Sequence, residues 1–187
     1  MVLPIVALGH PILKQVATEI DQSYTNYREL IDNMYETMYK DDGVGLAAPQ
    51  INLSIRLFVI DADPFKDTYP EAEGFKKVFI NPTIIEEAGK EWFFNEGCLS
   101  VPDIHEDVLR KERVLLRYYD EDFNKKEEWF EGVCARVIQH EYDHLEGKVF
   151  TDRVGAMTRL LLKKKLEKIR TGDINMPYKM IFCKKSR

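Results

Sequence analysis

The sequence predicts a single α+β domain, in which antiparallel β-sheets pack around a central helix and a further helix follows toward the C-terminus. Three observations support this expectation. The chain has 187 residues, of which 44% are hydrophobic, and this is enough for one domain with a full apolar core. Strand-like runs follow one another through the middle of the chain without regular alternation with helices. No internal repeat or low-complexity linker divides residues 1–187.

The first regular element is expected after a short extended arm. Between residues 25 and 40, apolar side chains recur every three or four residues, as in an amphipathic helix, and Asp41-Asp42-Gly43 would end it. Residues 43–50 then hold small residues around two glycines, which suits a loop that other groups approach closely. The apolar positions of the helix are Tyr27, Leu30, Ile31, Met34 and Met38.

Five runs rich in β-branched and aromatic residues predict strands in the middle of the chain. Asn81-Pro82, Ala88-Gly89 and residues 121–124 have the composition of turns and are expected to separate some of these strands. The expected strands cover residues 56–60, 77–80, 84–94, 108–119 and 127–130.

After Gly132 the pattern becomes helical. Val133, Val137, His140 and His144 follow at intervals of four, three and four residues, which places them on one helical face. A second helix is expected over residues 157–170, with the lysines at 163–165 on a solvated face. Residues 171–187 form a C-terminal extension, in which residues 178–183 would add a short edge strand.

Charge and composition exclude several classes of protein. The chain has 27 basic and 32 acidic residues, and this balance argues against sequence-specific nucleic-acid binding. It contains no run of about 18 apolar residues and does not begin like a signal peptide, so no membrane partner and a cytoplasmic location are expected. The three cysteines are spaced unlike a disulfide framework and are expected to be reduced thiols.

The strongest local signal is His140-Glu141-Tyr142-Asp143-His144, an H-E-x-x-H pattern on a predicted helix. Residues four apart lie on one face, so both imidazoles can point at one metal ion, with the carboxylate nearby as a base for the metal's water. A catalytic metal of this kind usually has three protein ligands, so a third is required. The alternative to a metal site is that His140 and His144 are two buried core histidines that bind no metal.

Three candidates for the third ligand can be compared. A metzincin would have a histidine at position 150, where Phe150 cannot ligate. A zinc peptidase of another type would use a later glutamate, and Glu167 is placed for this but lies among lysines that suit a solvated face. The remaining candidate is Cys98, which follows a glycine at the end of a strand-like run and would complete a Cys-His-His set.

Three separated motifs together resemble the peptide deformylase family. They are Gly43-Val44-Gly45-Leu46-Ala47-Ala48-Pro49-Gln50, Glu96-Gly97-Cys98-Leu99-Ser100 and Gln139-His140-Glu141-Tyr142-Asp143-His144, and the resemblance covers roughly residues 1–170. It implies a hydrolase that removes the formyl group from the N-terminal formylmethionine of a nascent polypeptide and releases formate. It also implies one divalent metal bound by Cys98, His140 and His144, usually ferrous iron, with zinc, nickel or cobalt able to occupy the site.

The resemblance also implies roles for other residues. Glu141 would be the general base that takes a proton from water and delivers it to the leaving amine. The side-chain amide of Gln50 and the backbone N–H of Leu99 would stabilise the charge on the formyl oxygen. Main-chain groups of Val44, Gly45 and Gly97 would bind the substrate backbone as an added strand.

The remaining expectations concern the surroundings of this site. Val133 and Val137, with Leu99 and Phe94 opposite, would form the pocket for the methionine side chain. Glu96 and Arg110 would support the ligands by a charge-assisted pair, unless they are two unrelated surface charges. His105 stands where many relatives are expected to have arginine, which leaves contacts to later substrate residues open.

Two alternatives to the hydrolase remain open at this stage. One is a zinc peptidase that uses Glu167 on the same helical metal site. The other is an inactive metal-binding module, for which folding would have to bring Cys134 close as a fourth ligand. The expected partner is the formylmethionyl nascent peptide, with a possible ribosome contact through the basic C-terminal stretch, and the protein is expected to be a monomer.

Overall fold

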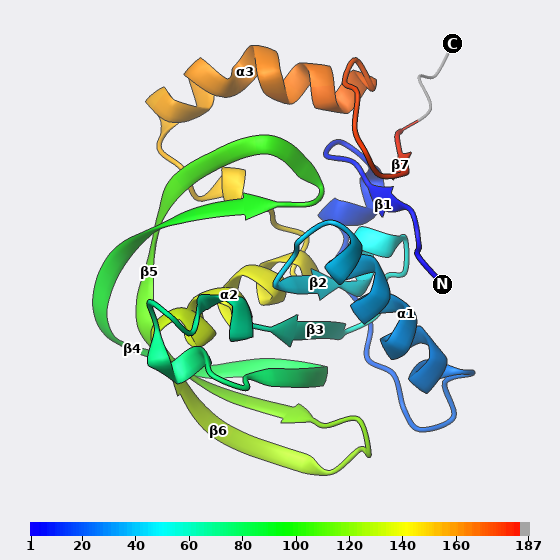
Figure 1. Ribbon diagram of the computed structural model, residues 1–187, viewed down its shortest axis with the longest axis vertical. Coiled ribbons are helices and arrows are strands. Elements are labelled where there is room, and N and C mark those ends of the chain that lie inside the picture. Colours follow the sequence, from blue (N-terminus) through cyan, green and yellow to red (C-terminus); the bar gives the residue numbers. More distant parts are fainter. Residues whose placement is uncertain (184–187) are drawn as a thin grey trace.

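The computed structural model describes residues 1–183 as a five-stranded antiparallel sheet with helices on its faces and edges (Figure 1). The spatial order of the strands, β2-β3-β4-β5-β6, is also their order along the chain. Each strand therefore pairs with its neighbour in sequence, which is a β-meander. The strands are β2 (Gly45–Ala47), β3 (Leu57–Asp61), β4 (Lys76–Cys98), β5 (Val101–Tyr119) and β6 (Lys125–Glu131).

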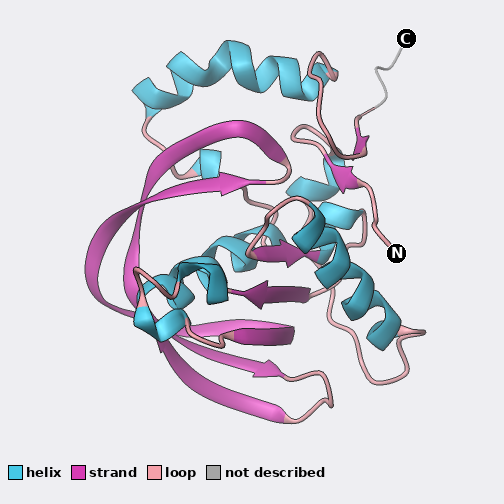
Figure 2. Cartoon of the chain, in the orientation of Figure 1, coloured by secondary structure: helices cyan, strands magenta, loops and turns pink. Residues whose placement is uncertain are grey.

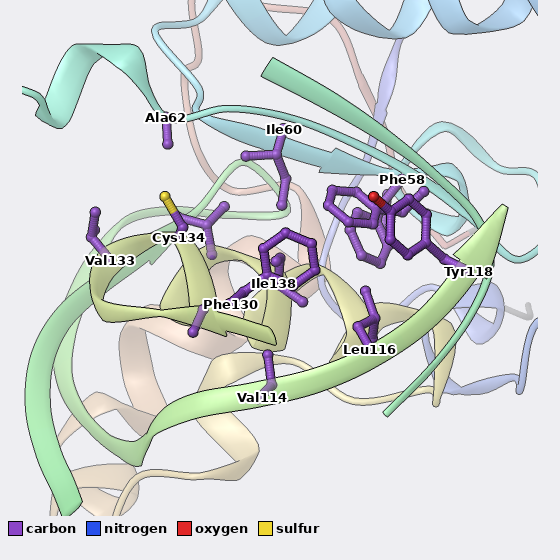
Figure 3. Packing of buried hydrophobic residues seen from close by; sticks show 14 of the residues in the cluster. Phe58, Ile60, Ala62, Val114, Leu116, Tyr118, Phe130, Val133, Cys134 and Ile138 are labelled. Carbon is purple, nitrogen blue, oxygen red and sulfur yellow. The ribbon is translucent and has the colours of Figure 1, made fainter. Parts of the chain in front are cut away.

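Helix α2 (Gly132–Leu145) lies at the centre of the molecule, with the long strands β4 and β5 curving around it (Figure 2). Almost every residue of α2 is buried, so the helix packs on more than one face. Ile138 of α2, Phe58 of β3 and Val114 of β5 belong to one hydrophobic core, and Figure 3 shows this packing. The predicted α+β class, with antiparallel strands around a central helix, is confirmed.

Two further helices cover the outside of this unit. Helix α1 (Tyr27–Lys40) buries Ile31, Met34 and Met38 in a second core cluster that also holds Leu57 of β3. Helix α3 (Ala156–Thr171) buries Leu162, Leu166 and Ile169 against residues of β5, and it ends at Gly172 with φ 74°. Both predicted helices are therefore present, within one or two residues of the expected limits.

The expected turns at Asn81-Pro82 and Ala88-Gly89 are wrong, because β4 runs through both without ending. The pairing of β4 with β5 shifts by one residue at each place, so these residues form β-bulges rather than reversals. Asn81 has φ 50° and Gly89 has φ 80°, conformations that asparagine and glycine tolerate better than other residues. The first bulge also explains Pro82 within a strand, since a bulge residue need not donate a backbone hydrogen bond to the neighbouring strand.

Two expectations about smaller elements also change. Residues 43–50 are not all loop, since they include β2 and the start of a 3-10 helix, Ala48–Ile51. The antiparallel expectation fails for one small sheet, in which β1 (Ile5–Val6) and β7 (Met180–Ile181) pair in parallel. The other 3-10 helices are Pro11–Lys14, Asp63–Phe65, Pro70–Ala72 and Phe150–Asp152.

The C-terminal extension therefore holds a strand, shorter than residues 178–183, and its last residues, 184–187, lie outside the described part of the chain. Within residues 1–183, none of the helices has both the length and the apolar character needed to cross a membrane.

Candidate metal centre

The two histidines of the H-E-x-x-H pattern lie one turn apart on α2, as their spacing predicts. Their ring centroids are 5.2 Å apart, and both side chains are buried. Nearly all residues from Val133 to Leu145 are buried, so packing on several sides stabilises the helix. Gly132 has φ 59°, a conformation that glycine tolerates, and this allows the abrupt change from β6 to α2.

Cys98 is the last residue of β4 and meets these histidines in space. Its Sγ lies 3.3 Å from Nε2 of His144, and one ligand atom from each of Cys98, His140 and His144 lies within 4.8 Å of the others. One thiolate sulfur and two imidazole nitrogens suit zinc or ferrous iron. Among residues 1–183 no other cluster of histidine, cysteine or carboxylate groups is arranged to hold a metal ion, and a three-ligand set leaves a position for water or substrate.

The surroundings of Cys98 favour the form of sulfur that binds metals. Burial by itself raises the pKa of the Cys98 thiol, but the facing imidazoles of His144 and His140 outweigh it and lower the pKa to about 5. The thiolate is the metal-binding form of cysteine, so little free energy is needed to deprotonate this side chain at neutral pH.

Glu141 lies between the two histidines in sequence and is buried beside them. It is 3% exposed, and no donor in the described chain reaches its Oε2 atom. Burial raises the pKa of the Glu141 carboxyl to about 7, and the nearby His140 and His144 limit the rise. A buried carboxylate with a free oxygen and a pKa near neutrality has the properties of a general base.

Gln50 presents its amide to the same place. Its Oε1 accepts the backbone N–H of Ala47 at 2.8 Å, which leaves the amino group facing the site. That group donates to Sγ of Cys98 and to Oγ of Ser100, both at 3.4 Å. Gln50, Cys98 and Leu99, the last of which directly follows Cys98 in the chain, all line the same cavity.

Glu96 connects the metal centre to a buried network of charges. One of its oxygens lies 2.9 Å from Nδ1 of His140, and Arg110 binds both oxygens at 2.7 and 2.9 Å. Burial by itself raises the pKa of Glu96, but the Arg110 hydrogen bonds outweigh it and hold the pKa well below its usual range. Glu96 and Arg110 are 4% and 3% exposed, so the interpretation as unrelated surface charges is wrong.

Three charged residues of this network were missed in the sequence. Arg136 donates to Glu96 at 3.1 Å, and Asp143 accepts from Arg110 at 2.7 Å and from Arg153. The sequence contains a signal for two of them. Arg136 lies four residues before His140 and Asp143 lies three after it, so both charged residues share the face of α2 that carries His140.

A cavity of about 540 Å³ opens beside the metal centre and is lined by all three sequence motifs. Val44 and Gly45 line it at the start of β2, the edge strand of the sheet, and Gly97 of β4 also lines it. The predicted pocket residues Val137, Leu99 and Phe94 line it, whereas Val133 does not and is instead fully buried in the central core. The cavity also has wall residues that the motifs did not indicate, among them Phe65, Met176 and Tyr178.

His105 lies exposed at the rim of this cavity, against Gly97. A Cβ added to Gly97 would lie 2.5 Å from two atoms of the His105 ring, so the glycine permits this close contact. His105 therefore lines the cavity from an exposed position beside Gly97.

The geometry removes both alternative ligand sets. Glu167 is exposed on α3, where it pairs with Arg170 at 3.7 Å, and it does not belong to the metal-binding group. Cys134 donates its thiol to the backbone oxygen of Glu71 at 3.3 Å and packs in the central core. Neither the peptidase set nor a closed four-ligand site is present within residues 1–183.

Known proteins match this chain over most or all of its length. Residues 2–160 match the family model described as polypeptide deformylase. The chain is 52% identical to a peptide deformylase from Flavobacterium psychrophilum, with all of both chains covered, and 51% identical to one from Christiangramia forsetii, again over both complete chains.

Solved structures agree with the sequence comparisons. A crystal structure of a peptide deformylase from Legionella pneumophila superposes with a TM-score of 0.80 at 36% identity, covering 95% of this chain and 100% of that one. A peptide deformylase from Synechococcus elongatus in complex with actinonin superposes with a TM-score of 0.78 at 40% identity, covering 89% and 86%. Because the family model matches residues 2–160 and relatives about half identical match over the whole chain, the chain belongs to the peptide deformylase family.

Proposed function

We propose that this chain removes the formyl group from the N-terminal formylmethionine of nascent polypeptides by metal-dependent hydrolysis, releasing formate and a free amino terminus. The observation that carries the proposal is the convergence of Cys98, His140 and His144 on one candidate metal site, beside a cavity that Cys98, His140 and Glu141 line, in a chain of this family. The three ligand atoms come from a strand end and one helix, so the site exists only in the folded chain.

Cys98, His140 and His144 would hold one divalent metal, with ferrous iron as the native ion and zinc, nickel or cobalt as functional substitutes. When bound, the metal acts as a Lewis acid toward the formyl oxygen and lowers the pKa of water. Metal analysis of protein purified without oxygen tests the identity of the ion. If the ion is iron, activity should decline in air, whereas full activity after prolonged aeration without reductant would contradict iron.

The protein groups account for the proton transfers. Glu141 takes a proton from water as the oxygen adds to the formyl carbon, and it then gives that proton to the amine nitrogen as the C–N bond breaks. Its unpartnered oxygen and raised pKa support both steps, since the group must accept and release a proton near neutral pH. The Gln50 amide and the Leu99 N–H donate to the formyl oxygen while it carries negative charge.

The cavity walls suit a peptide that begins with methionine. Backbone groups of Val44 and Gly45 belong to the edge of the sheet, where an extended peptide can pair as an added strand, with Gly97 on its other side. Val137, Leu99 and Phe94 supply apolar surface for the methionine side chain. Val133 supports this wall from the core instead of touching the substrate.

Formate release from a formyl-Met-Ala peptide tests the proposal. Wild-type protein should release formate, and Glu141→Ala should lower kcat by about 10²- to 10⁴-fold while it retains bound metal. Cys98→Ala should lose the metal and the activity together. Glu167→Ala is the matched control, because this exposed glutamate should change neither. Equal rates for wild type and Glu141→Ala would contradict the proposal, and full metal content in Cys98→Ala would contradict the ligand set.

The same function implies a cellular setting. Nascent chains emerge from ribosomes, so we place the protein in the cytoplasm, acting as a monomer in contact with the ribosome. The exposed lysines of α3, at positions 163–165 and 168, offer a basic surface for such a contact. Sedimentation of the protein with and without ribosomes tests both statements. Failure to cosediment at low salt would exclude the contact, and a dimer mass alone in solution would exclude the monomer.

A further inference from the structure

The chain beyond α3 returns to the cavity of the metal centre. From Asp173 to Met180 exposed and half-buried residues alternate strictly, which is the pattern of an extended segment with one face inward. The inward residues are Ile174, Met176, Tyr178 and Met180, and two of them, Met176 and Tyr178, line the cavity. This segment lies beyond residue 160, where the match to the family model ends.

Tyr178 makes one directed contact inside the site. Its hydroxyl donates to the backbone oxygen of Leu99 at 2.8 Å, across 79 residues of sequence. Leu99 and Ser100 are the two turn residues that connect β4 to β5, directly after the ligand Cys98. The contact therefore fixes one peptide group of the turn whose neighbouring peptide carries the proposed Leu99 donor.

Two other contacts hold the same turn from different sides. The backbone N–H of Leu8 donates to the oxygen of Ser100 at 2.9 Å, and Gln50 donates to its Oγ. Leu8 follows β1, which pairs with β7, and the N–H of Ala7 binds the oxygen of Ile181 at 2.8 Å. The C-terminal segment thus holds the turn directly through Tyr178 and indirectly through β1.

We infer that Tyr178 is a positioning residue for the reaction: by binding the Leu99 carbonyl it holds the turn so that the Leu99 N–H, in the neighbouring peptide group, meets the formyl oxygen. The inference rests on the proposed function, because the Leu99 donor matters only if an oxyanion forms there. Without a hydrogen bond to the Leu99 carbonyl, the peptide planes of this two-residue turn can rotate and move the Leu99 N–H. Misplacement of a donor by about 1 Å can lower the rate by up to about 10²-fold.

Tyr178→Phe tests this by removing one oxygen atom and nothing else. Tyr35→Phe is the matched control, since the half-buried Tyr35 also donates to a backbone oxygen, that of Lys77 at 3.0 Å, and does not line the cavity. Tyr178→Phe should lower kcat about tenfold with KM changed less than twofold, whereas Tyr35→Phe should keep both. A loss of general stability would instead affect the two variants alike, and thermal unfolding measures it.

Hydrogen exchange measured by NMR adds a readout that needs no turnover. In zinc-loaded and metal-free protein alike, the Leu99 amide should exchange several-fold faster in Tyr178→Phe than in wild type and Tyr35→Phe. The inference is overturned if kcat in Tyr178→Phe equals that of Tyr35→Phe, or if the exchange rate of Leu99 does not change. Absence of formate release from wild type would instead refute the proposed function, and the exchange comparison would still decide whether Tyr178 holds the turn.

Discussion

The backbone of Gly45 lies directly against the carboxylate of Glu141. A Cβ added at position 45 would lie 2.8 Å from Cδ of Glu141 and closer still to one of its oxygens. The edge strand β2 and the central helix α2 therefore meet at the candidate base, and only glycine leaves room for it. Glycine is needed at position 45, in the Gly43–Gln50 motif, because a side chain would collide with Glu141, and not because the backbone adopts an unusual conformation.

Gly45→Ala should displace Glu141 and lower kcat by about 10²-fold, because a misplaced base no longer reaches both water and amine. Gly155→Ala is the control, since nothing lies within 4 Å of a Cβ added there. Steady-state formate release from both variants, with metal content measured in parallel, checks this. Equal kcat values in the two variants would show that the carboxylate has room to move.

Arg110→Met should destabilise the fold strongly. Arg110 pairs with two buried carboxylates, Glu96 and Asp143, and its loss leaves both short of a partner, which costs about 3–5 kcal/mol. Arg117→Met is the control on the same strand, because its bond to Glu127 at 2.8 Å is equally short but its side chain is 47% exposed. That change should cost less than about 1 kcal/mol. Urea unfolding of metal-free protein measures both, and similar costs would argue against a buried network.

Glu96→Gln should weaken metal binding by about 10- to 100-fold. The carboxylate of Glu96 holds Nδ1 of His140, and such a contact fixes the ring and raises its basicity as a ligand. Glu87→Gln, an exposed change on the same strand, should bind metal as tightly as wild type. Competition with a chelator of known affinity gives the two constants. An unchanged constant in Glu96→Gln would mean that the ring is held by packing alone.

Removal of the metal should make Cys98 reactive. Cys98 lines the cavity, and its low pKa makes it a thiolate at neutral pH, so iodoacetamide should modify it in metal-free protein and not in loaded protein. Cys134 provides an internal reference, because burial raises its pKa to about 12 and should keep it unmodified in both forms. A Cys183→Ser background leaves these two thiols for mass spectrometry. Equal modification of Cys98 with and without metal would exclude it as a ligand.

Local pattern was enough to predict the helices and most of the strands. The recurrence of apolar residues in α1 and the spacing of His140 and His144 in α2 each depend on the geometry of one helix. Residues close together in the sequence determine that geometry. The same local reasoning failed at Asn81 and Gly89, where turn residues form bulges inside β4. Pairing with β5 continues on both sides of each bulge, and this long-range pairing outweighs the local preference for a turn.

The charge network was only partly predictable. The Glu96–Arg110 pair could be predicted because Glu96 lies close to Cys98 in the sequence and Arg110 lies on the following strand. Arg136 and Asp143 could be assigned to the network only once the structure showed which side chains face α2. Burial decides this, because the same residue types on an exposed face would be ordinary surface charges.

The sequence by itself determined the chemistry of the site, through the identity of Cys98, His140, Glu141 and His144 and the helical spacing of the last three. Only the tertiary structure decided that Tyr178 reaches Leu99, that Gly45 touches Glu141, and that Val133 faces the core instead of the cavity. The physical reason is separation along the chain. Residues within one helix have their relative positions set by backbone geometry, whereas contacts between distant segments depend on how sheet, helix and C-terminal segment pack together.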